Sequence, residues 1–326
     1  MVTATSRTGR VLASCAAALL GCRGLHSYEK ATAQFGDATS AGVAATRNVV
    51  GAAHETCQMR AWFHAVGDRF QRPGFERGQE VLSRSSDVPK PDGRGTMTWG
   101  EYCKQLADDD QAFGGALSAL EAYAAALRNV ATGNDIALDT DLTASVARDA
   151  DDVARKLGSS SLRRAQELSG PIAALASVVL GVIKTKRLRD AIIQGDKPVS
   201  TILHGMGQYL GAAKDQCRDA EELKNDLVRS ADRAIPVRGE SKAVPPEVAG
   251  SSLALYEFSR LESARLLALD QQLAATAGLV QDLSEAHAEL VRGAHASATD
   301  QAVRAFIATK AEAIAKQVNV LRNIKG

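Results

Sequence analysis

The chain has few aromatic residues, and this shortage restricts the folds that it can adopt. Phe, Trp and Tyr together make up only 4% of the sequence, whereas alanine, which loses no side-chain entropy in a helix, is abundant. No stretch alternates apolar and polar residues for long enough to predict a β-strand. The composition therefore favours closely packed helices.

The chain also has almost no net charge. It contains 39 Lys and Arg residues against 38 Asp and Glu residues, a formal charge of +1. Two of the positive charges, Arg7 and Arg10, lie in the first 21 residues, and without them the net charge is near −1. This balance argues against a nucleic-acid partner and against a polybasic membrane patch.

Motifs of common catalytic and metal sites are missing as well. The sequence has no His-Glu-x-x-His, Gly-x-Ser-x-Gly, Walker or paired-cysteine zinc pattern. The glycines of 205–211 resemble a dinucleotide loop only superficially, because the third comes one place too late and no strand precedes them. His54 and Cys57 lie one helical turn apart, but a closed metal site needs about four ligands. We therefore expect no catalytic residues, no cofactor, no metal and no enzymatic activity.

The N-terminus has the three parts of an export signal. Arg7 and Arg10 precede an apolar run at 11–20, which is too short to span a membrane. The run ends in Leu19-Leu20-Gly21-Cys22, which resembles the lipobox of bacterial lipoproteins. That resemblance implies a signal peptide at 1–21. It also implies that Cys22 carries fatty acids such as palmitate, becomes the new N-terminus and anchors the protein in a membrane.

The residue after the anchor bears on the destination. Arg23 stands where such families often have the Asp that retains a lipoprotein at the inner membrane, so the resemblance favours the cell envelope and, in a Gram-negative cell, the periplasmic face of the outer membrane. Two other interpretations stay open. One is a mitochondrial presequence, because no acid occurs before Glu29, although the apolar run is not amphipathic. The other is an ordinary buried N-terminal helix.

Beyond the signal, apolar or small residues recur at alternating spacings of three and four. This pattern predicts one lipid-anchored long helix over 22–70. A helix of about 40 residues would be roughly 60 Å long, so we expect an elongated protein. The members of this N-terminal seam are Tyr28, Ala31, Phe35, Ala38, Gly42, Ala45, Val49, Ala52, Thr56, Met59, Phe63, Val66 and Phe70.

Proline-rich stretches divide the remainder of the chain. Residues 71–97 and 236–250 are interpreted as linkers, with a helical bundle at 98–235 between them. Thr98 and Glu101 form a capping box that begins the bundle. Residues 251–326 are expected to form a long C-terminal helix, or a nearly collinear pair, packing on the bundle. The predicted fold class is all-α: an elongated, mostly antiparallel bundle of about five to seven helices with long coiled-coil-like members.

Three features inside the bundle have specific interpretations. The most apolar segment, 172–183, follows a proline suited to a first helical turn and is interpreted as a central helix buried by its neighbours. Membrane insertion is the alternative. His287 falls on an apolar seam and is expected to be a core polar group that fixes helix register. The acidic residues 108–110 lack the calcium-loop pattern and are expected on a solvated face.

The cysteines predict one disulfide if export is correct. Removal of the signal takes away Cys15 and acylation uses Cys22, which leaves Cys57, Cys103 and Cys217 in an oxidising compartment. Cys217 lies on an apolar seam and is expected to be buried as a thiol. Cys57 and Cys103 lie beside seam positions on helices that the first linker folds together. A tight hairpin would offset them by about 12 Å, so their pairing requires the linker to allow that sliding.

These observations favour a non-enzymatic envelope lipoprotein that acts as a helical scaffold or binding protein. Its body is similar to uncharacterised helical periplasmic lipoproteins, which implies a protein partner or self-association through the seams and no nucleic-acid partner. The alternative is a membrane-active protein that inserts 172–183 in the manner of helical pore-forming toxins. Such toxins are usually released, which a lipid anchor opposes.

Overall fold

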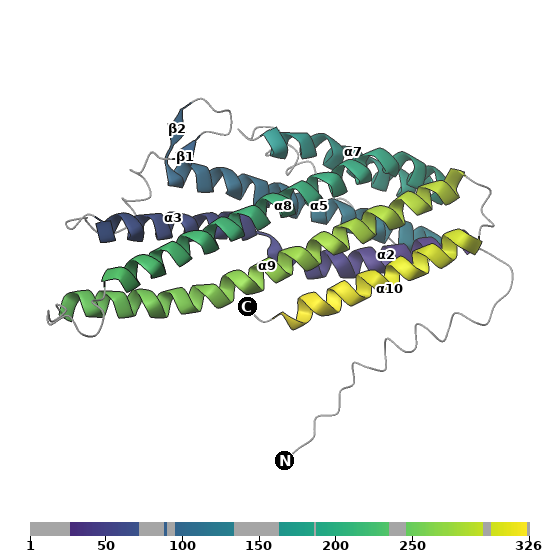
Figure 1. Cartoon of the computed structure of the whole chain (residues 1–326). Coiled ribbons are helices and arrows are strands. Elements are labelled where there is room, and N and C mark those ends of the chain that lie inside the picture. Colours follow the sequence, from purple (N-terminus) through teal and green to yellow (C-terminus); the bar gives the residue numbers. More distant parts are fainter. Residues whose placement is uncertain are drawn as a thin grey trace, which may run out of the picture.

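The fold is given by a computed structural model that describes residues 27–71, 88–89, 95–133, 163–185, 187–234, 246–295 and 301–324. Within these ranges, seven α-helices pack side by side into an elongated body, which confirms the all-α bundle (Figure 1). The predicted signal peptide, with Cys22, and the stretch 134–162 lie outside the described residues. The elements are α2 Ser27–Thr46, η2 Arg47–Val49, α3 Ala52–Gln71, β1 Val88–Pro89, β2 Thr96–Met97, α5 Trp99–Ala131, α7 Arg163–Thr185, α8 Leu188–Ala234, α9 Pro246–His295 and α10 Gln301–Asn323.

The prediction of a single long N-terminal helix is wrong. α2 ends at Thr46, a 3-10 turn follows, and α3 begins at Ala52. Gly51 has a φ of +96°, a conformation that glycine adopts without steric cost and that a right-handed helix cannot contain. The apolar seam nevertheless continues through the break, since its members Phe35, Val49 and Phe63 are all buried.

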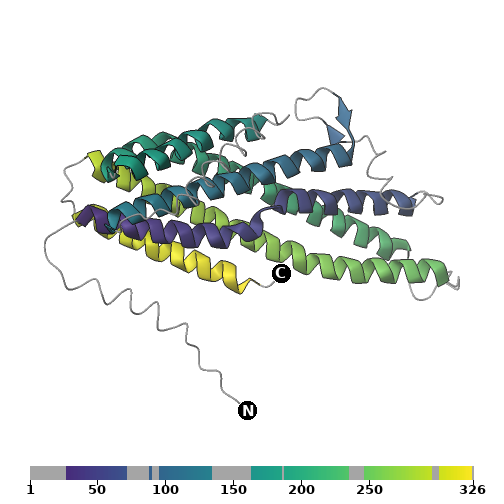
Figure 2. The ribbon, with the colours of Figure 1, turned by 180° about the vertical axis from the view of Figure 1, so that it is seen from behind.

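α2 and α3 each contact α9 on their own side of the break, and the register against α9 shifts by two positions across it. The Phe35 ring lies 5.8 Å from the His287 ring, and the Trp62 ring lies 4.0 Å from the Phe258 ring. The 27 positions from Phe35 to Trp62 therefore correspond to the 29 positions from His287 to Phe258 on α9. Figure 2 shows the two helices following each other end to end. We call this pair the N-terminal rod.

α5 runs antiparallel to the N-terminal rod. The capping box predicted at its start is confirmed: the Thr98 hydroxyl accepts from the Glu101 N–H at 3.2 Å, and the Glu101 carboxylate accepts from the Thr98 N–H at 2.9 Å. At the other end, Arg128 pairs with Asp37 at 2.8 Å. Gly36 allows this contact, because a Cβ there would lie 2.8 Å from the Ala124 carbonyl oxygen.

The apolar segment 172–183 lies at the periphery, which corrects the expectation of a central helix. α7 begins at Arg163, so Pro171 lies inside the helix instead of opening it. Ile172, Leu175 and Val179 are buried where α7 packs on α5 and α8, but Leu180 is 36% exposed. Sequence hydropathy overstated the burial because, apart from Leu180, the outward positions such as Ala174 and Ser177 carry small side chains, which cost little free energy in water.

The C-terminal helices form a hairpin and are not collinear. α9 begins at Pro246, so the end of the predicted second linker belongs to the helix, with proline at the first helical position, where its missing N–H costs nothing. α10 turns back along α9, and Lys310 pairs with Asp282 at 2.9 Å. Arg189 of α8 donates to the carbonyls of Ala294 and His295, which satisfies acceptors that the end of a helix leaves open.

Candidate functional site

A buried carboxylate, that of Asp110, is hydrogen-bonded at the break in the N-terminal rod. Asp110 of α5 is only 6% exposed, and its Oδ2 accepts the N–H of His54 at 3.2 Å. Its Oδ1 accepts the hydroxyl of Tyr209, from α8, at 2.5 Å, and that hydroxyl also lies 3.3 Å from the carbonyl oxygen of Val49. Burial raises the pKa of Asp110, and burial together with the neighbouring carboxylate raises that of Tyr209.

Asp110 acts as a helix cap supplied by another helix. The first N–H groups of a helix need acceptors, and Gly51, just before α3, has no side chain to provide one. The interpretation of 108–110 as a solvated face is therefore wrong for Asp110. The signal was present, because Leu106, Asp110 and Phe113 follow a spacing of four and three and all three are buried.

We expect Asp110→Ala to lower the free energy of unfolding by about 2 kcal/mol, because it leaves the part-buried His54 N–H without its acceptor and the Tyr209 hydroxyl with only the longer contact to the Val49 carbonyl. The matched control is Asp108→Ala, two residues earlier on α5, which should change stability by less than about 0.5 kcal/mol. Urea unfolding followed by circular dichroism measures both. Equal losses for the two variants would contradict the cap.

α3 and α5 are also joined covalently. Cys57 and Cys103, the pair selected from the sequence, form a disulfide with a Cα–Cα distance of 5.4 Å. His54 Nδ1 lies 2.8 Å from the backbone oxygen of Cys103, so His54 and Cys57 are both engaged within the protein. In the described ranges no group of three or more His, Cys, Asp or Glu side chains could hold a metal ion.

The remaining described cysteine is a buried thiol, as its seam position predicted. Cys217 is 3% exposed and donates to the carbonyl oxygen of Leu266 at 3.5 Å. Burial raises the pKa of the thiol to about 12. Because the thiolate is the reactive form of cysteine, the Cys217 thiol is unreactive at neutral pH.

His287 is a hydrogen-bonded core residue, which confirms its interpretation from the seam. It is 2% exposed on α9, and its Nε2 shares a hydrogen bond of 3.2 Å with the hydroxyl of Tyr123 on α5. Burial lowers its pKa to about 4, so the ring is neutral at physiological pH. With Phe35 of α2 beside it, the imidazole fixes three helices in one register.

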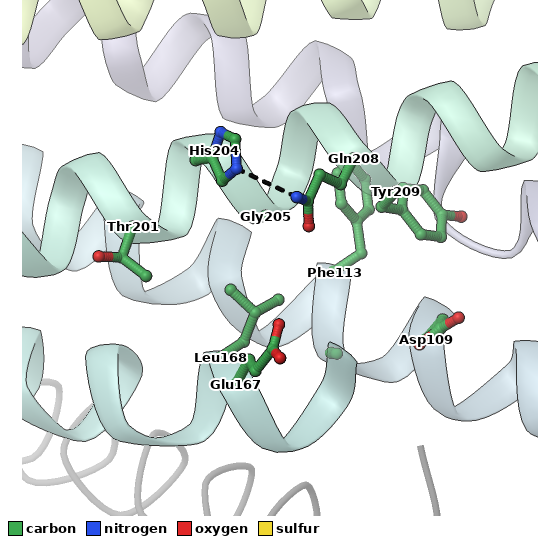
Figure 3. Close-up of a pocket in the computed structure, with 10 residues that line it drawn as sticks. Asp109, Phe113, Glu167, Leu168, Thr201, His204, Gly205, Gln208 and Tyr209 are labelled. Carbon is green, nitrogen blue, oxygen red and sulfur yellow. Dashed lines mark hydrogen bonds between the residues drawn. The ribbon is translucent and has the colours of Figure 1, made fainter. Parts of the chain in front are cut away.

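A small cavity of about 190 Å³ opens between α5, α7 and α8 (Figure 3). We call it the α5/α7/α8 pocket. Its size depends on Gly205, because a Cβ at that position would lie 2.6 Å from Leu168 Cδ2. Residues 205–211 lie within the continuous helix α8, so they form no dinucleotide loop. The described lining residues are Asp109, Ala112, Phe113, Glu167, Leu168, Thr201, His204, Gly205, Gln208 and Tyr209.

Exposed aromatic and apolar side chains occur on the stretches of α3 and α9 around the contact between Trp62 and Phe258. Trp62 is 40% exposed while it stacks on Phe258, and on α9 Tyr256 is 50% and Leu261 64% exposed. We call these residues the α3/α9 surface. They lie toward the end of the body opposite the start of α2 (Figure 1). Exposed aromatics of this kind are enriched in protein interfaces.

Comparison with known proteins finds no match: no family model, no curated protein and no solved structure is similar to the chain. None of the helices described here is long and apolar enough to cross a membrane. Any functional proposal therefore rests on the residues of this chain.

Proposed function

We propose that the protein is a non-enzymatic lipoprotein of the bacterial cell envelope that binds another envelope component through its helical body. The Cys57–Cys103 bond carries this proposal, because stable disulfides belong to oxidising compartments such as the periplasm. Two further features support the proposal. A lipobox-like tetrad ends at Cys22, and the described residues form long helices whose side chains pack together in the interior. Localisation at the periplasmic face of the outer membrane fits Arg23.

The position of the anchor suggests how such a protein is presented. Only four residues separate Cys22 from Ser27, where α2 begins, and five extended steps of chain span at most about 18 Å. An acyl group on Cys22 would therefore hold the α2 end of the body close to the membrane. The α3/α9 surface would then be displayed away from the membrane, where it can meet a protein partner.

Fractionation of cells tests the anchor. Cys22→Ala should release or mislocalise the protein, because it removes the acylated thiol, whereas Cys15→Ala, a matched change inside the proposed signal peptide, should leave the protein on the membrane. Mass spectrometry of wild-type protein extracted from membranes should find an N-terminus at Cys22 with added acyl mass. An unmodified chain that begins at Met1 and stays in the cytosol would refute the anchor.

The same cells test the binding role. A photo-crosslinker placed at position 62 should give discrete adducts in the anchored protein and lose them in Cys22→Ala, because the partner then lies in another place. Position 320 on α10, where Val320 is 43% exposed outside the α3/α9 surface, is the control. Adducts at 320 and none at 62 would contradict binding through the α3/α9 surface, and leakage of liposomes on addition of protein would favour membrane activity.

A further inference from the structure

α10 covers only one part of α9. Gln317 of α10 lies against Gly278 of α9, where a Cβ would be 2.9 Å from the Gln317 amide nitrogen. The two helices run in opposite directions, so α10 ends at Asn323 about level with position 272 of α9. Since α9 begins at Pro246, about 26 residues of it, or roughly 39 Å, extend past the end of α10 (Figure 1).

A heptad line runs along the outward side of this part of α9. Its positions are spaced alternately by four and three, and it continues under α10, where Gly278 and Glu285 belong to it. α3 lies on the opposite side of the helix: Phe258 is two positions from Arg260, about 200° around α9, and it stacks on Trp62 of α3. We call the uncovered part of the line the outer α9 seam. Its positions are 246, 250, 253, Glu257, Arg260, Ala264, Leu267 and Gln271.

The described side chains of the outer α9 seam are open to solvent. Leu267 is 61% exposed, and Ala264 and Gln271 are exposed as well. Glu257 and Arg260 are 61% and 74% exposed while they pair with each other at 3.2 Å. An exposed ion pair of this kind contributes little free energy, so its two charges can change partners at small cost. The seam is therefore a helix contact that α10 fills further along and that is unfilled here.

The end of α10 restricts how another helix can lie on this seam. A helix that ran on past position 272 of α9 would collide with α10, so the occupant must end there. The α9 helix of a second copy meets this condition when it runs antiparallel, with its first residue, Pro246, level with Gln271 of the first copy. In that register the seam positions face each other in regular layers: 250 with 267, 253 with 264, and 257 with 260 of the second copy.

This register brings complementary residues together. Glu257 of each copy faces Arg260 of the other, which gives two ion pairs between the copies at the centre of the contact. Leu267 of one copy faces position 250 of the other, which is a glycine and leaves room for the leucine. The chain as a whole has a formal charge of only +1, so repulsion between two copies is small.

We propose that two copies of the chain associate through their outer α9 seams in this antiparallel register. The paired length is that of a short coiled coil with few large apolar residues, so we expect a dissociation constant of about 10–100 µM. Because the copies run in opposite directions, the pair forms between copies in solution or on facing surfaces, and not between neighbours that stand upright on one membrane. The inference goes beyond the proposed envelope function, does not depend on the lipid anchor, and leaves Trp62 outside the contact.

Sedimentation equilibrium of the purified full-length protein between about 1 µM and 1 mM tests the association. The wild type should pass from monomer to dimer over this range. Glu257→Arg and Arg260→Glu should each weaken dimerisation at least about tenfold, because like charges then face each other in both central layers. An equimolar mixture of the two variants should dimerise at least as tightly as the wild type, because opposite charges face each other again. The mixture also shows that neither variant has simply misfolded.

The control variants lie on α8. Asp226 and Arg229 form an exposed pair with the same spacing of three, and Asp226→Arg and Arg229→Glu should leave the dissociation constant unchanged. A spin label on Gln271→Cys measures the direction of the pairing, since the two labels should be about 40 Å apart in the antiparallel register and close together in a parallel pair.

A protein that stays monomeric at about 1 mM would overturn the inference. A mixture of Glu257→Arg and Arg260→Glu that remains monomeric, or equal weakening by the α8 variants, would overturn the assigned contact. Adjacent spin labels would overturn the antiparallel register. None of these results bears on the fractionation of Cys22→Ala or on adducts at position 62, so the two proposals fail separately.

Discussion

Replacing Cys57 and Cys103 together by alanine should lower the free energy of unfolding by about 4 kcal/mol. The bond joins residues that are 46 positions apart, and removing it returns the entropy of a loop of that length to the unfolded chain. Chemical denaturation of oxidised wild-type protein and of the double variant measures the difference. Reduction of the wild-type protein should produce a loss of similar size.

Cys217→Ala is the control, because Cys217 is also a buried cysteine but belongs to no disulfide. It should cost only about 1 kcal/mol, the effect of removing one small buried group. Equal stability of the double variant and the wild type would contradict a constraining role for the bond. Free thiols at both Cys57 and Cys103 in protein taken from the periplasm would refute the pairing itself.

Acidification should destabilise the fold through His287. Its pKa is about 4 in the folded state against an ordinary value of 6.5, so the unfolded chain binds this proton first. The stability contributed by the neutral buried ring is complete above about pH 6.5 and is lost as the pH falls toward 4. At 1.36 kcal/mol for each pKa unit, the loss reaches about 3 kcal/mol. Urea unfolding at several pH values between 7 and 4 measures it.

His287→Gln isolates this effect, because glutamine can still bond the Tyr123 hydroxyl but does not titrate. Between pH 7 and 4 the free energy of unfolding should fall for the wild type and for the variant by different amounts. The fall should be about 3 kcal/mol smaller for the variant. Asp110 has a raised pKa and contributes with the opposite sign, but it does so in both proteins and cancels in the comparison. Parallel pH profiles would show that His287 is not the titrating group.

Features that depend on local sequence could be predicted. The capping box at Thr98 and Glu101 needs only residues three positions apart, and the N-terminal seam needs only their spacing. His287 was also identifiable, because a polar residue at an apolar position of a regular seam must find a partner inside the core. That partner, Tyr123, lies 164 positions away in the sequence, so the spacing of residues around His287 could not identify it.

Features that depend on backbone geometry or on distant helices could not be predicted. Nothing in the spacing of the N-terminal seam reveals that Gly51 takes a positive φ, because the same three-four pattern continues on both sides. The spacing of Asp110 from Leu106 and Phe113 indicated its burial, but its partners, the N–H of His54 and the hydroxyl of Tyr209, lie on other helices and could not be predicted from that spacing. The α5/α7/α8 pocket draws its rim from three helices, so its residues share no motif in the sequence.

The interrupted N-terminal rod has a mechanical consequence. Its break at 47–51 lies alongside stretches of α5, α8 and α9 that run on without interruption, as the contacts of Asp110, Tyr209 and Arg265 with residues around the break require. These continuous helices stiffen the rod at its break, because bending at Gly51 would require all three to bend as well. α9 alone extends over 50 residues, about 75 Å at 1.5 Å per residue. A force applied where α2 begins is therefore transmitted along the stiff helical body to the α3/α9 surface, and it does not bend the chain at the break.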